Sequence, residues 1–101
     1  MLRALFGLGP KIDLSKMIAD GALILDVRTP DEFRHGHVKG SRNIPLDRLA
    51  KDLKKLDKQR PIVACCQSGM RSGSAVAVLE RNGYTAHNGG SWMNVQSRSP
   101  K

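Results

Sequence analysis

Apolar and polar positions divide the chain into short segments that favour strands and helices in turn. The segments that favour strands are residues 22–27, 43–45, 61–64 and 84–87. The segments that favour helices are residues 13–20, 46–57 and 72–82, with a further brief helix between Thr29 and Gly36. The first strand segment is a continuous apolar run, which is expected for a strand buried on both faces. In the second helix segment, leucines recur at spacings of three and four, which indicates an amphipathic helix.

Capping residues support two of these helices. Asp13 is placed to cap the first helix and Gly21 to end it. Thr29 precedes Pro30 and stands three residues before Glu32, which is the arrangement of a capping box. Because helices and strands alternate, the sequence predicts the α/β class, with a central, mostly parallel sheet of four to five strands and helices on both faces.

The chain has 101 residues, which is enough for one small domain. We expect residues 1–11 to form an apolar N-terminal tail, residues 12–96 to form the domain, and residues 97–101 to form a flexible tail. The first ten residues are too short for a membrane span and lack a signal-peptide cleavage region. A truncated signal peptide or a small surface anchor stays open as an alternative.

Basic residues outnumber acidic ones, 17 to 9, which gives a formal charge of +8. The densest group, at residues 51–60, is interrupted by Asp52 and Asp57 and contains no aromatic residue on which a base could stack. We therefore expect no nucleic-acid surface. Attraction of a small anionic substrate explains the charge better, and docking of an acidic protein partner is the alternative for the lysines at 51–58.

The chain has two cysteines, Cys65 and Cys66, and they are neighbours. A bridge between adjacent residues is strained, so no disulfide framework is expected. This favours a reducing compartment and predicts a cytoplasmic protein. An exported or membrane-surface location is the alternative if the apolar N-terminus belongs to a targeting segment.

The stretch from Cys65 to Ser72 carries the clearest chemical signal. It lies where a strand ends and a helix begins, so successive N–H groups can converge on one point. The helix N-terminus adds partial positive charge there, and Arg71 can add a full charge. Such a place stabilises a thiolate and binds small anions. The sequence therefore predicts an active site that handles sulfur or an oxyanion.

Other polar residues are expected at the same edge of the sheet. Ligands of open parallel sheets bind at the carboxyl ends of the strands. Asp26 and Arg28 end one predicted strand, Cys66 ends another, and a Gly89–Gly90 turn follows a third. We expect an ion pair or loop-fixing hydrogen bonds from Asp26 and Arg28, beneath the site rather than in contact with substrate.

Several motifs, taken together, resemble the single-domain rhodaneses, which are thiosulfate-type sulfurtransferases. They are the loop CQSGMRS at 66–72, LDVR at 25–28, EF at 32–33, GH at 36–37, GS at 40–41, NIP at 43–45, NGY at 82–84 and GGSW at 89–92. The resemblance covers residues from about 12 to about 95 and implies a small rhodanese-like domain.

By this resemblance, Cys66 is the nucleophile. It takes sulfur from an anionic donor such as thiosulfate or a persulfide, and passes it from a Cys66 persulfide to a thiol or cyanide. The resemblance implies no metal and no organic cofactor, and ping-pong kinetics are expected. A carrier that delivers the persulfide sulfur to a partner protein is an alternative reading of the same chemistry.

A second alternative follows from counting residues from Cys65. Five residues separate Cys65 from Arg71, and Ser72 follows, which is the spacing of cysteine-dependent phosphatases and would also suit an arsenate reductase. Only four separate Cys66 from Arg71, a tighter loop suited to a sulfur atom. Side chains alternate along a strand, so the two cysteines should face opposite sides. No histidine precedes Cys65, and we favour Cys66.

The remaining loop residues have separate expected roles. Gln67, Ser68, Gly69 and Met70 should act mainly through their N–H groups, with Gly69 allowing the tight curve and Met70 placed at the mouth of the pocket. Arg71 is assigned to substrate binding or thiolate stabilisation.

Three further residues are given structural roles. Ser72 is expected to cap the following helix rather than to hydrogen-bond the sulfur. His37 should be structural, because a thiolate that is already formed needs no base. Trp92 should pack the last turn against the core.

Overall fold

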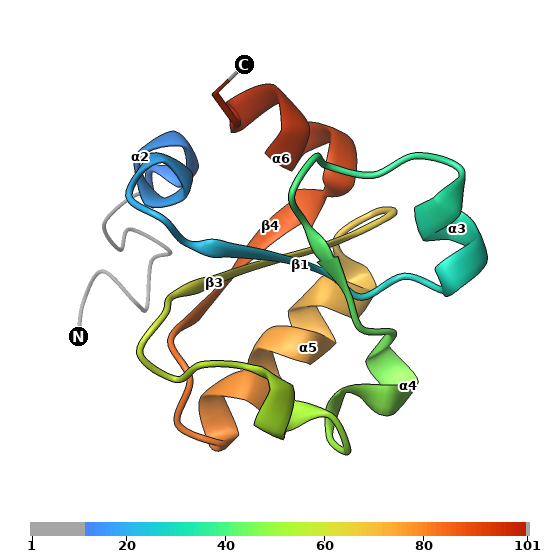
Figure 1. The fold of residues 1–101 in the computed structure, drawn as a ribbon, viewed down its shortest axis with the longest axis vertical. Helices are drawn as coiled ribbons and strands as arrows, with labels where there is room; N and C mark the ends of the chain where they lie inside the picture. Colours follow the sequence, from blue (N-terminus) through green and yellow to red (C-terminus); the bar gives the residue numbers. More distant parts are fainter. Residues whose placement is uncertain (1–11, 101) are drawn as a thin grey trace, which may run out of the picture.

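A parallel sheet of four strands, in the order β2-β1-β3-β4, forms the centre of the structure (Figure 1). The computed structural model describes residues 12–100, so the tail predicted at 1–11 lies outside the described residues. The strands are β1 (Leu23–Asp26), β2 (Arg42–Asn43), β3 (Ile62–Cys66) and β4 (Ala86–Ser91). The helices are α2 (Leu14–Ala19), α3 (Pro30–Arg34), α4 (Leu46–Leu49), the 3-10 helix η1 (Leu53–Lys55), α5 (Met70–Arg81) and α6 (Trp92–Arg98). The predicted α/β class is confirmed.

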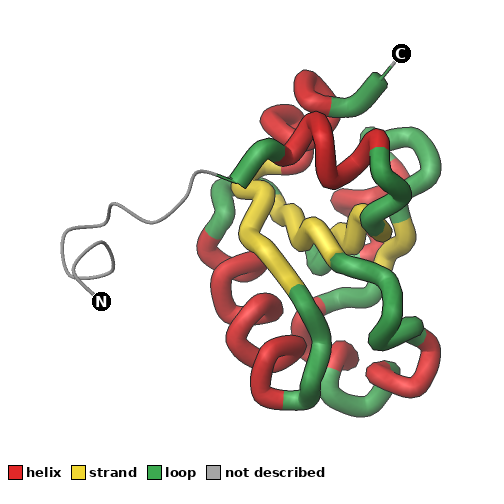
Figure 2. Tube along the Cα trace, turned by 90° about the vertical axis from the view of Figure 1, so that its left-hand side faces the viewer, coloured by secondary structure: helices red, strands yellow, loops and turns green. Residues whose placement is uncertain are grey.

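Helices cover both faces of the sheet, as predicted. Figure 1 and the turned view in Figure 2 place α2 and α6 on one face, and α4 and α5 on the other. Two buried apolar clusters fill these layers. Cys66 belongs to the cluster on the α5 side and Cys65 to the cluster on the α6 side. The alternation of side chains along β3 therefore separates the two cysteines, as the sequence predicts.

The predicted caps are present at the first two described helices. The side chain of Asp13 accepts a hydrogen bond from the N–H group of Lys16 at 3.0 Å. At α3, the Thr29 hydroxyl accepts from the N–H group of Glu32, and the Glu32 carboxylate accepts from the N–H group of Thr29 at 3.0 Å. This reciprocal capping box fixes both the start of α3 and the position of the Glu32 side chain.

The prediction of one amphipathic helix over residues 46–57 is wrong. The segment divides into α4 and the separate 3-10 turn η1. Its leucines still face the core, but its carbonyl groups find partners elsewhere in the chain. The Tyr84 hydroxyl donates to the carbonyl of Leu53 at 2.7 Å, and the Arg42 guanidinium donates to the carbonyl of Lys55 at 2.8 Å. The Leu53 carbonyl also accepts from the N–H group of Leu56 at 3.0 Å, so the long-range bonds add to the 3-10 turn and tie it to distant parts of the chain.

Three other boundaries differ from the sequence prediction. Helix α5 begins at Met70, two residues before the predicted Ser72. Strand β4 runs to Ser91 rather than ending at 87, because β3 is irregular between Ala64 and Cys66 and its end pairs with Ser91. Helix α6 continues to Arg98, two residues into the segment expected to be a tail. Among residues 12–100, no helix combines the length and the apolar character that crossing a membrane requires.

Gly89 in β4 is closely packed between α6 and the neighbouring strand β3. A Cβ atom added there would stand 2.5 Å from Val95 Cγ2 and 2.8 Å from Val63 Cγ1, and both valines are fully buried. We expect Gly89→Ala to lower the free energy of unfolding by about 1–3 kcal/mol, as overpacked cores do. Urea unfolding measures this effect.

Gly73→Ala is the matched control for that variant. Gly73 is helical and its added Cβ would make only an ordinary contact, at 3.4 Å from Asn88 Nδ2. The free energy of unfolding should stay unchanged or rise by about 0.5–1 kcal/mol, because alanine favours a helix. Equal destabilisation by the two substitutions would contradict the packing argument.

Candidate active site

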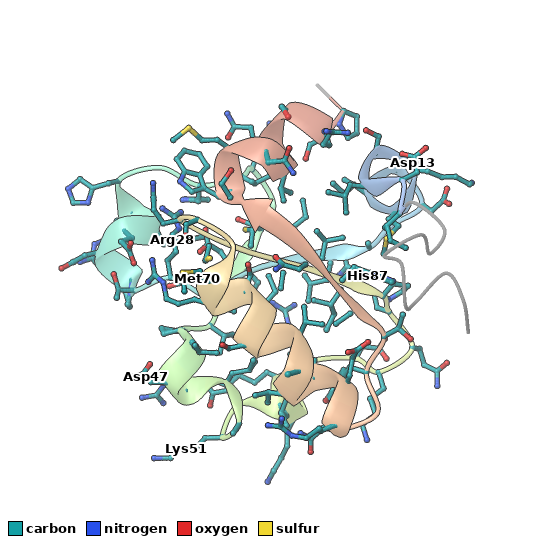
Figure 3. The ribbon with its side chains drawn as sticks, turned by 180° about the vertical axis from the view of Figure 1, so that it is seen from behind. Asp13, Arg28, Asp47, Lys51, Met70 and His87 are labelled. Carbon is teal, nitrogen blue, oxygen red and sulfur yellow. The ribbon has the colours of Figure 1, made fainter. Side chains whose placement is uncertain are left out.

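The carboxyl ends of β1, β3 and β4 meet at one edge of the sheet, as predicted for a parallel arrangement. Cys65 pairs in register with Asp26 of β1, and Cys66 with Ser91 of β4. The loop between β3 and α5 starts from this edge. Figure 3 shows Met70 at the start of α5 and Arg28 close by, on the side of α3.

Cys66 lies at the base of that loop, and its sulfur receives hydrogen bonds from the loop backbone. The N–H group of Gly69 donates to Cys66 Sγ at 2.9 Å, and the N–H group of Ser72 does so at 3.4 Å. Gly69 has a φ of 102°, a left-handed conformation that lets the loop turn back over the sulfur. The Cys66 side chain is fully buried. The convergence of N–H groups expected from the sequence is therefore present.

The two cysteines differ in acidity. Burial raises the pKa of the Cys66 thiol, but hydrogen bonds from the Ser72 hydroxyl and from the N–H groups of Ser72, Gly69 and Ser68 outweigh it, and the pKa lies below its ordinary value. For Cys65, burial raises the pKa to about 12, and the charge of Asp26 contributes to the rise. Of the two thiols, only Cys66 is thus shifted toward the thiolate form.

Ser72 has a different role from the one predicted. The N-cap of α5 is Gly69, so Ser72 lies inside the first turn of the helix. Its hydroxyl lies 3.4 Å from Cys66 Sγ and donates to Asn88 Oδ1 at 2.7 Å. The expectation that Ser72 caps the helix is wrong, and its contact is with the sulfur. The reason is that the helix begins at Met70 rather than two residues later.

Asn88 is a site residue that the sequence reasoning missed. Besides accepting from Ser72, its Oδ1 accepts from the N–H group of Gly90 at 2.9 Å, and its Nδ2 donates to the carbonyl of Gly69 at 3.0 Å. The amide therefore joins β4 to the Cys66 loop. A polar residue just before the paired glycines was the available signal in the sequence.

Ser72→Ala is expected to raise the pKa of Cys66, because it removes a hydroxyl that can turn from Asn88 Oδ1 to donate to the sulfur once the thiolate forms. The loss of one hydrogen bond to a charged group corresponds to about one pH unit. The pKa of Cys66 lies below its ordinary value in the wild type. The rate of alkylation by iodoacetamide should therefore rise with pH and reach its plateau at a lower pH than it does for an ordinary thiol. In the variant the same curve should move to higher pH.

Ser68→Ala provides the control for this shift. Ser68 is exposed and acts on the sulfur through its backbone N–H group, which alanine retains. Its alkylation curve should coincide with that of the wild type. A Ser72→Ala curve that also coincides with the wild type would show that the hydroxyl does not stabilise the thiolate.

Arg71, expected to bind substrate or the thiolate, forms an ion pair with Glu32 of α3. The guanidinium donates to both carboxylate oxygens, at 2.7 Å and 3.0 Å. The hydrogen bond from Arg71, with a second from the Thr29 N–H group, lowers the pKa of Glu32 to about 2. Sequence reasoning gave Glu32 only its capping role, because the pair joins residues 39 positions apart.

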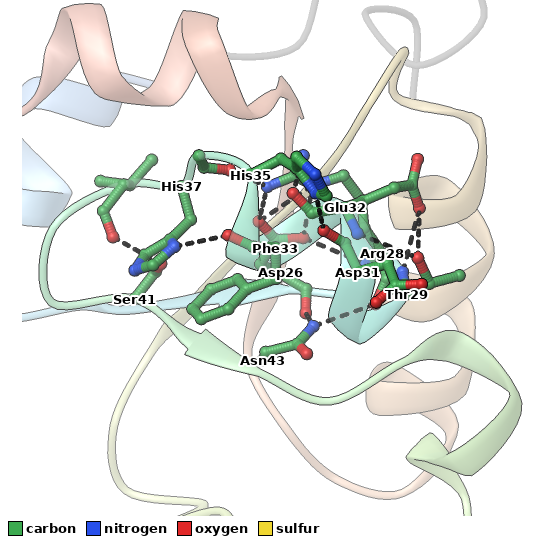
Figure 4. A network of polar contacts seen from close by, with 12 residues as sticks. Asp26, Arg28, Thr29, Asp31, Glu32, Phe33, His35, His37, Ser41 and Asn43 are labelled. Atoms are coloured by element: carbon green, nitrogen blue, oxygen red, sulfur yellow. Dashed lines mark hydrogen bonds and ion pairs between the residues drawn. The ribbon is translucent and has the colours of Figure 1, made fainter.

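Asp26 and Arg28 form the buried ion pair that the sequence led us to expect (Figure 4). Arg28 Nη2 lies 2.7 Å from Asp26 Oδ2, and Arg28 Nε lies 2.9 Å from Asp26 Oδ1. Arg28 also donates to the carbonyl of Gly36 at 2.7 Å, and Asn43 donates to the carbonyls of both Asp26 and Arg28. These bonds hold the segment that leads from β1 into α3 beneath the site.

His37 and Trp92 make packing contacts near this edge. His37 stacks on Phe33 with ring centroids 3.6 Å apart, and its Nδ1 lies 2.7 Å from the Phe33 carbonyl oxygen. Trp92 packs against the cluster on the α6 side, and the Arg28 guanidinium lies 5.0 Å from its ring. Both residues therefore have the structural surroundings that the sequence suggests.

An open pocket of about 370 Å³ borders the loop on the side of α3. Gln67 of the loop, Trp92, and the two carboxylates of Asp31 and Glu32 are among the residues that line it. Met70, expected at the pocket mouth, does not line this pocket and is 80% exposed. Among residues 12–100, no three His, Cys, Asp or Glu side chains cluster in a way that could hold a metal ion.

The sequence family described as rhodanese-like domain matches residues 11–96. The chain is similar to uncharacterized protein YqhL of Bacillus subtilis, with 42% identity over 64 residues, which are 63% of this chain and 51% of that protein. It is also similar to thiosulfate sulfurtransferase GlpE of Stutzerimonas stutzeri, with 35% identity over 65 residues, which are 64% of this chain and 60% of that protein. The chain thus spans about half to three fifths of the length of these relatives.

The fold is similar to a solved structure as well. The crystal structure of reduced Bacillus anthracis CoADR-RHD matches with a TM-score of 0.76 and 29% sequence identity. The match covers 95% of this chain and 18% of that much longer chain. The likeness therefore extends over almost the whole fold described above and corresponds to one part of the larger protein.

Proposed function

The chain belongs to the family of rhodanese-like domains, and from this membership and the geometry around Cys66 we propose that it is a sulfurtransferase that works through a Cys66 persulfide. The relatives support sulfurtransferase activity in general. The nucleophile, the donor and the acceptor are our proposal for this chain. The observation that carries it is the Cys66 sulfur, which accepts hydrogen bonds from the loop and has a lowered pKa.

The proposed reaction has two displacement steps. The Cys66 thiolate attacks the sulfane sulfur of a donor, thiosulfate or a persulfide, and the S–S bond of the donor breaks. Sulfite or a thiolate leaves with the electron pair. A nucleophilic acceptor, cyanide or a thiolate, then attacks the outer sulfur of the Cys66 persulfide, and Cys66 leaves as a thiolate. This sequence is covalent catalysis with ping-pong kinetics.

The loop supports both steps by the same means. The N–H groups of Gly69 and Ser72 stabilise negative charge on Cys66 Sγ, which is the nucleophile of the first step and the leaving group of the second. Because these donors are fixed by the turn at Gly69, they require no rearrangement during the reaction. A reducing compartment such as the cytoplasm suits this chemistry, because Cys66 has to be a free thiol between turnovers.

Intact-mass measurement tests the proposal directly. The purified protein should gain the mass of one sulfur atom, about 32 Da, after incubation with a sulfane-sulfur donor, and a thiol should remove it. The gain should persist in Cys65→Ala, which keeps the loop and Cys66. If neither thiosulfate nor an organic persulfide adds sulfur to the wild-type protein, the proposed function is wrong.

The geometry bears differently on the two alternative functions, a phosphatase or arsenate reductase and a persulfide carrier. A phosphatase or arsenate reductase would need Cys65, whose side chain lies on the other face of the sheet and whose pKa is raised to about 12. The geometry does not support it. A persulfide carrier shares the first step and differs in the second. Rapid charging of Cys66, followed by slow transfer to free cyanide, would favour the carrier and a partner protein as acceptor.

A further inference from the structure

The positive charge beside the Cys66 loop is already balanced by carboxylates. Arg71 is tied by both guanidinium contacts to Glu32, at 2.7 Å and 3.0 Å. Arg28 is tied to Asp26 and to the carbonyl of Gly36. Among residues 12–100, each arginine that borders the loop or its pocket thus has a carboxylate partner of its own, so neither offers a free guanidinium to an anion.

Glu32 is also held in place by hydrogen bonds from Thr29. Its Oε1 accepts from the Thr29 N–H group at 3.0 Å and from the Thr29 hydroxyl at 3.2 Å, in addition to the bond from Arg71. These contacts belong to the capping box that starts α3. Pulling Glu32 away from Arg71 therefore disturbs the helix start as well. Its pKa of about 2 means that it carries its charge at every pH used in an assay.

The charged side chains around the pocket that borders the loop are also paired with one another. Two of its lining residues, Asp31 and Glu32, are acidic, and Arg28 is paired as described above. Asp31 and Glu32 are in turn paired with Arg34 and Arg71, so a dianion that enters this pocket beside Gln67 finds no arginine without a carboxylate partner. An uncharged donor does not depend on such an arginine, and the apolar ring of Trp92 offers it a contact.

From this arrangement we infer that Glu32 determines which class of sulfur donor the site accepts, favouring organic persulfides, which react as the neutral form R–S–SH, over dianionic thiosulfate. The inference rests on the proposed function and specifies which class of sulfur donor it uses. In the favoured reaction, the Cys66 thiolate attacks the outer sulfur of R–S–SH and the donor S–S bond breaks. R–S⁻ leaves with the electron pair, and Cys66–S–SH carries the transferred sulfur and its proton. No other oxidant or reductant is required.

Glu32→Gln is the variant that tests this role. Glutamine also forms a capping box, so α3 should keep its start, while the negative charge next to Arg71 is removed. We expect kcat/KM for thiosulfate to rise about three- to tenfold, within the range of a partly exposed ion pair. The kcat/KM for hydroxyethyl persulfide, an organic donor with no other charge, should change less than about twofold. Added salt should slow the thiosulfate reaction of the variant more than that of the wild type.

The ratio of the two kcat/KM values is the decisive quantity. A change in the pKa of Cys66 alters both donors together and cancels in this ratio. Glu80→Gln is the matched control, because it removes the same charge from an exposed position on α5 far along the helix from the loop. Its ratio should equal that of the wild type. The double variant Glu32→Gln/Arg71→Gln should lose the gain with thiosulfate, because the released guanidinium is gone.

The possible outcomes separate the inference from the proposed function. An unchanged donor ratio in Glu32→Gln, in protein that still forms a persulfide, overturns the role of Glu32 alone. A gain that survives in the double variant also overturns it, because the gain then does not come from Arg71. If no donor adds sulfur to Cys66 in the wild type, the proposed function fails, and the inference fails with it.

Discussion

Replacing Cys66 with serine is expected to lower sulfur transfer by about 10³-fold or more, as removal of a covalent nucleophile does in other enzymes. A serine oxygen has a far higher pKa than a thiol and cannot take part in the same exchange between sulfur atoms. The hydroxyl fits the space and can use the same N–H donors of Gly69 and Ser72, so the fold should be retained. Thiocyanate formation from thiosulfate and cyanide measures the activity, and far-ultraviolet circular dichroism checks the fold.

Cys65→Ala is the partner variant for this experiment. Cys65 belongs to the buried cluster on the α6 side, on the opposite face of the sheet from the cluster that contains Cys66. Its loss should reduce stability modestly and leave the activity of the folded protein within a few-fold of the wild type. Full thiocyanate formation in Cys66→Ser, or a loss of activity confined to Cys65→Ala, would show that Cys66 is not the nucleophile.

Arg28→Ala should be the most destabilising of the substitutions considered. Arg28 is 3% exposed and Asp26 is fully buried, so removing the guanidinium leaves an uncompensated charge in the interior. Such losses amount to about 3–5 kcal/mol, a large part of the total stability of a small domain. The bonds to the carbonyls of Gly36 and Glu32 disappear as well. Urea unfolding followed by circular dichroism measures the free energy of unfolding.

Arg34→Ala is the control for the buried pair. Arg34 forms an ion pair with Asp31, but both side chains are largely exposed. An exposed pair of this kind contributes about 0–1 kcal/mol. A similar loss of stability in the two arginine variants would show that the charge of Asp26 is relieved by solvent after Arg28 is removed, contrary to the burial seen here.

The features predicted well from the sequence are those set by neighbouring residues. The apolar run of β1, the caps at Asp13 and Thr29, and the opposite facing of Cys65 and Cys66 each follow from a local pattern, and the structure confirms them. The alternation of side chains along β3 is enough to place Cys65 and Cys66 on opposite faces of the sheet. Because the strands are parallel, their carboxyl ends lie at one edge of the sheet, as expected.

The features that were missed depend on contacts between distant parts of the chain. Residues 46–57 have a helical leucine pattern, yet helix α4 ends at Leu49, and Tyr84 and Arg42 donate to carbonyl groups of the separate turn η1. The Arg71–Glu32 pair joins positions 39 residues apart, and Asn88 reaches the loop from β4. None of these partners can be chosen from spacing alone. The roles proposed for Cys66 and the loop residues stay predictions until the experiments above are done.

The placement of the two cysteines on opposite faces of β3 has a consequence for resistance to oxidation. Cys65 and Cys66 are the only thiols of the chain, and both are free. If an oxidant converts Cys66 to a sulfenic acid, Cys65 cannot resolve it, because its side chain faces the other cluster and burial holds its pKa near 12. Recovery then depends on a thiol supplied from outside the chain. The active form is therefore tied to the thiol supply of its surroundings.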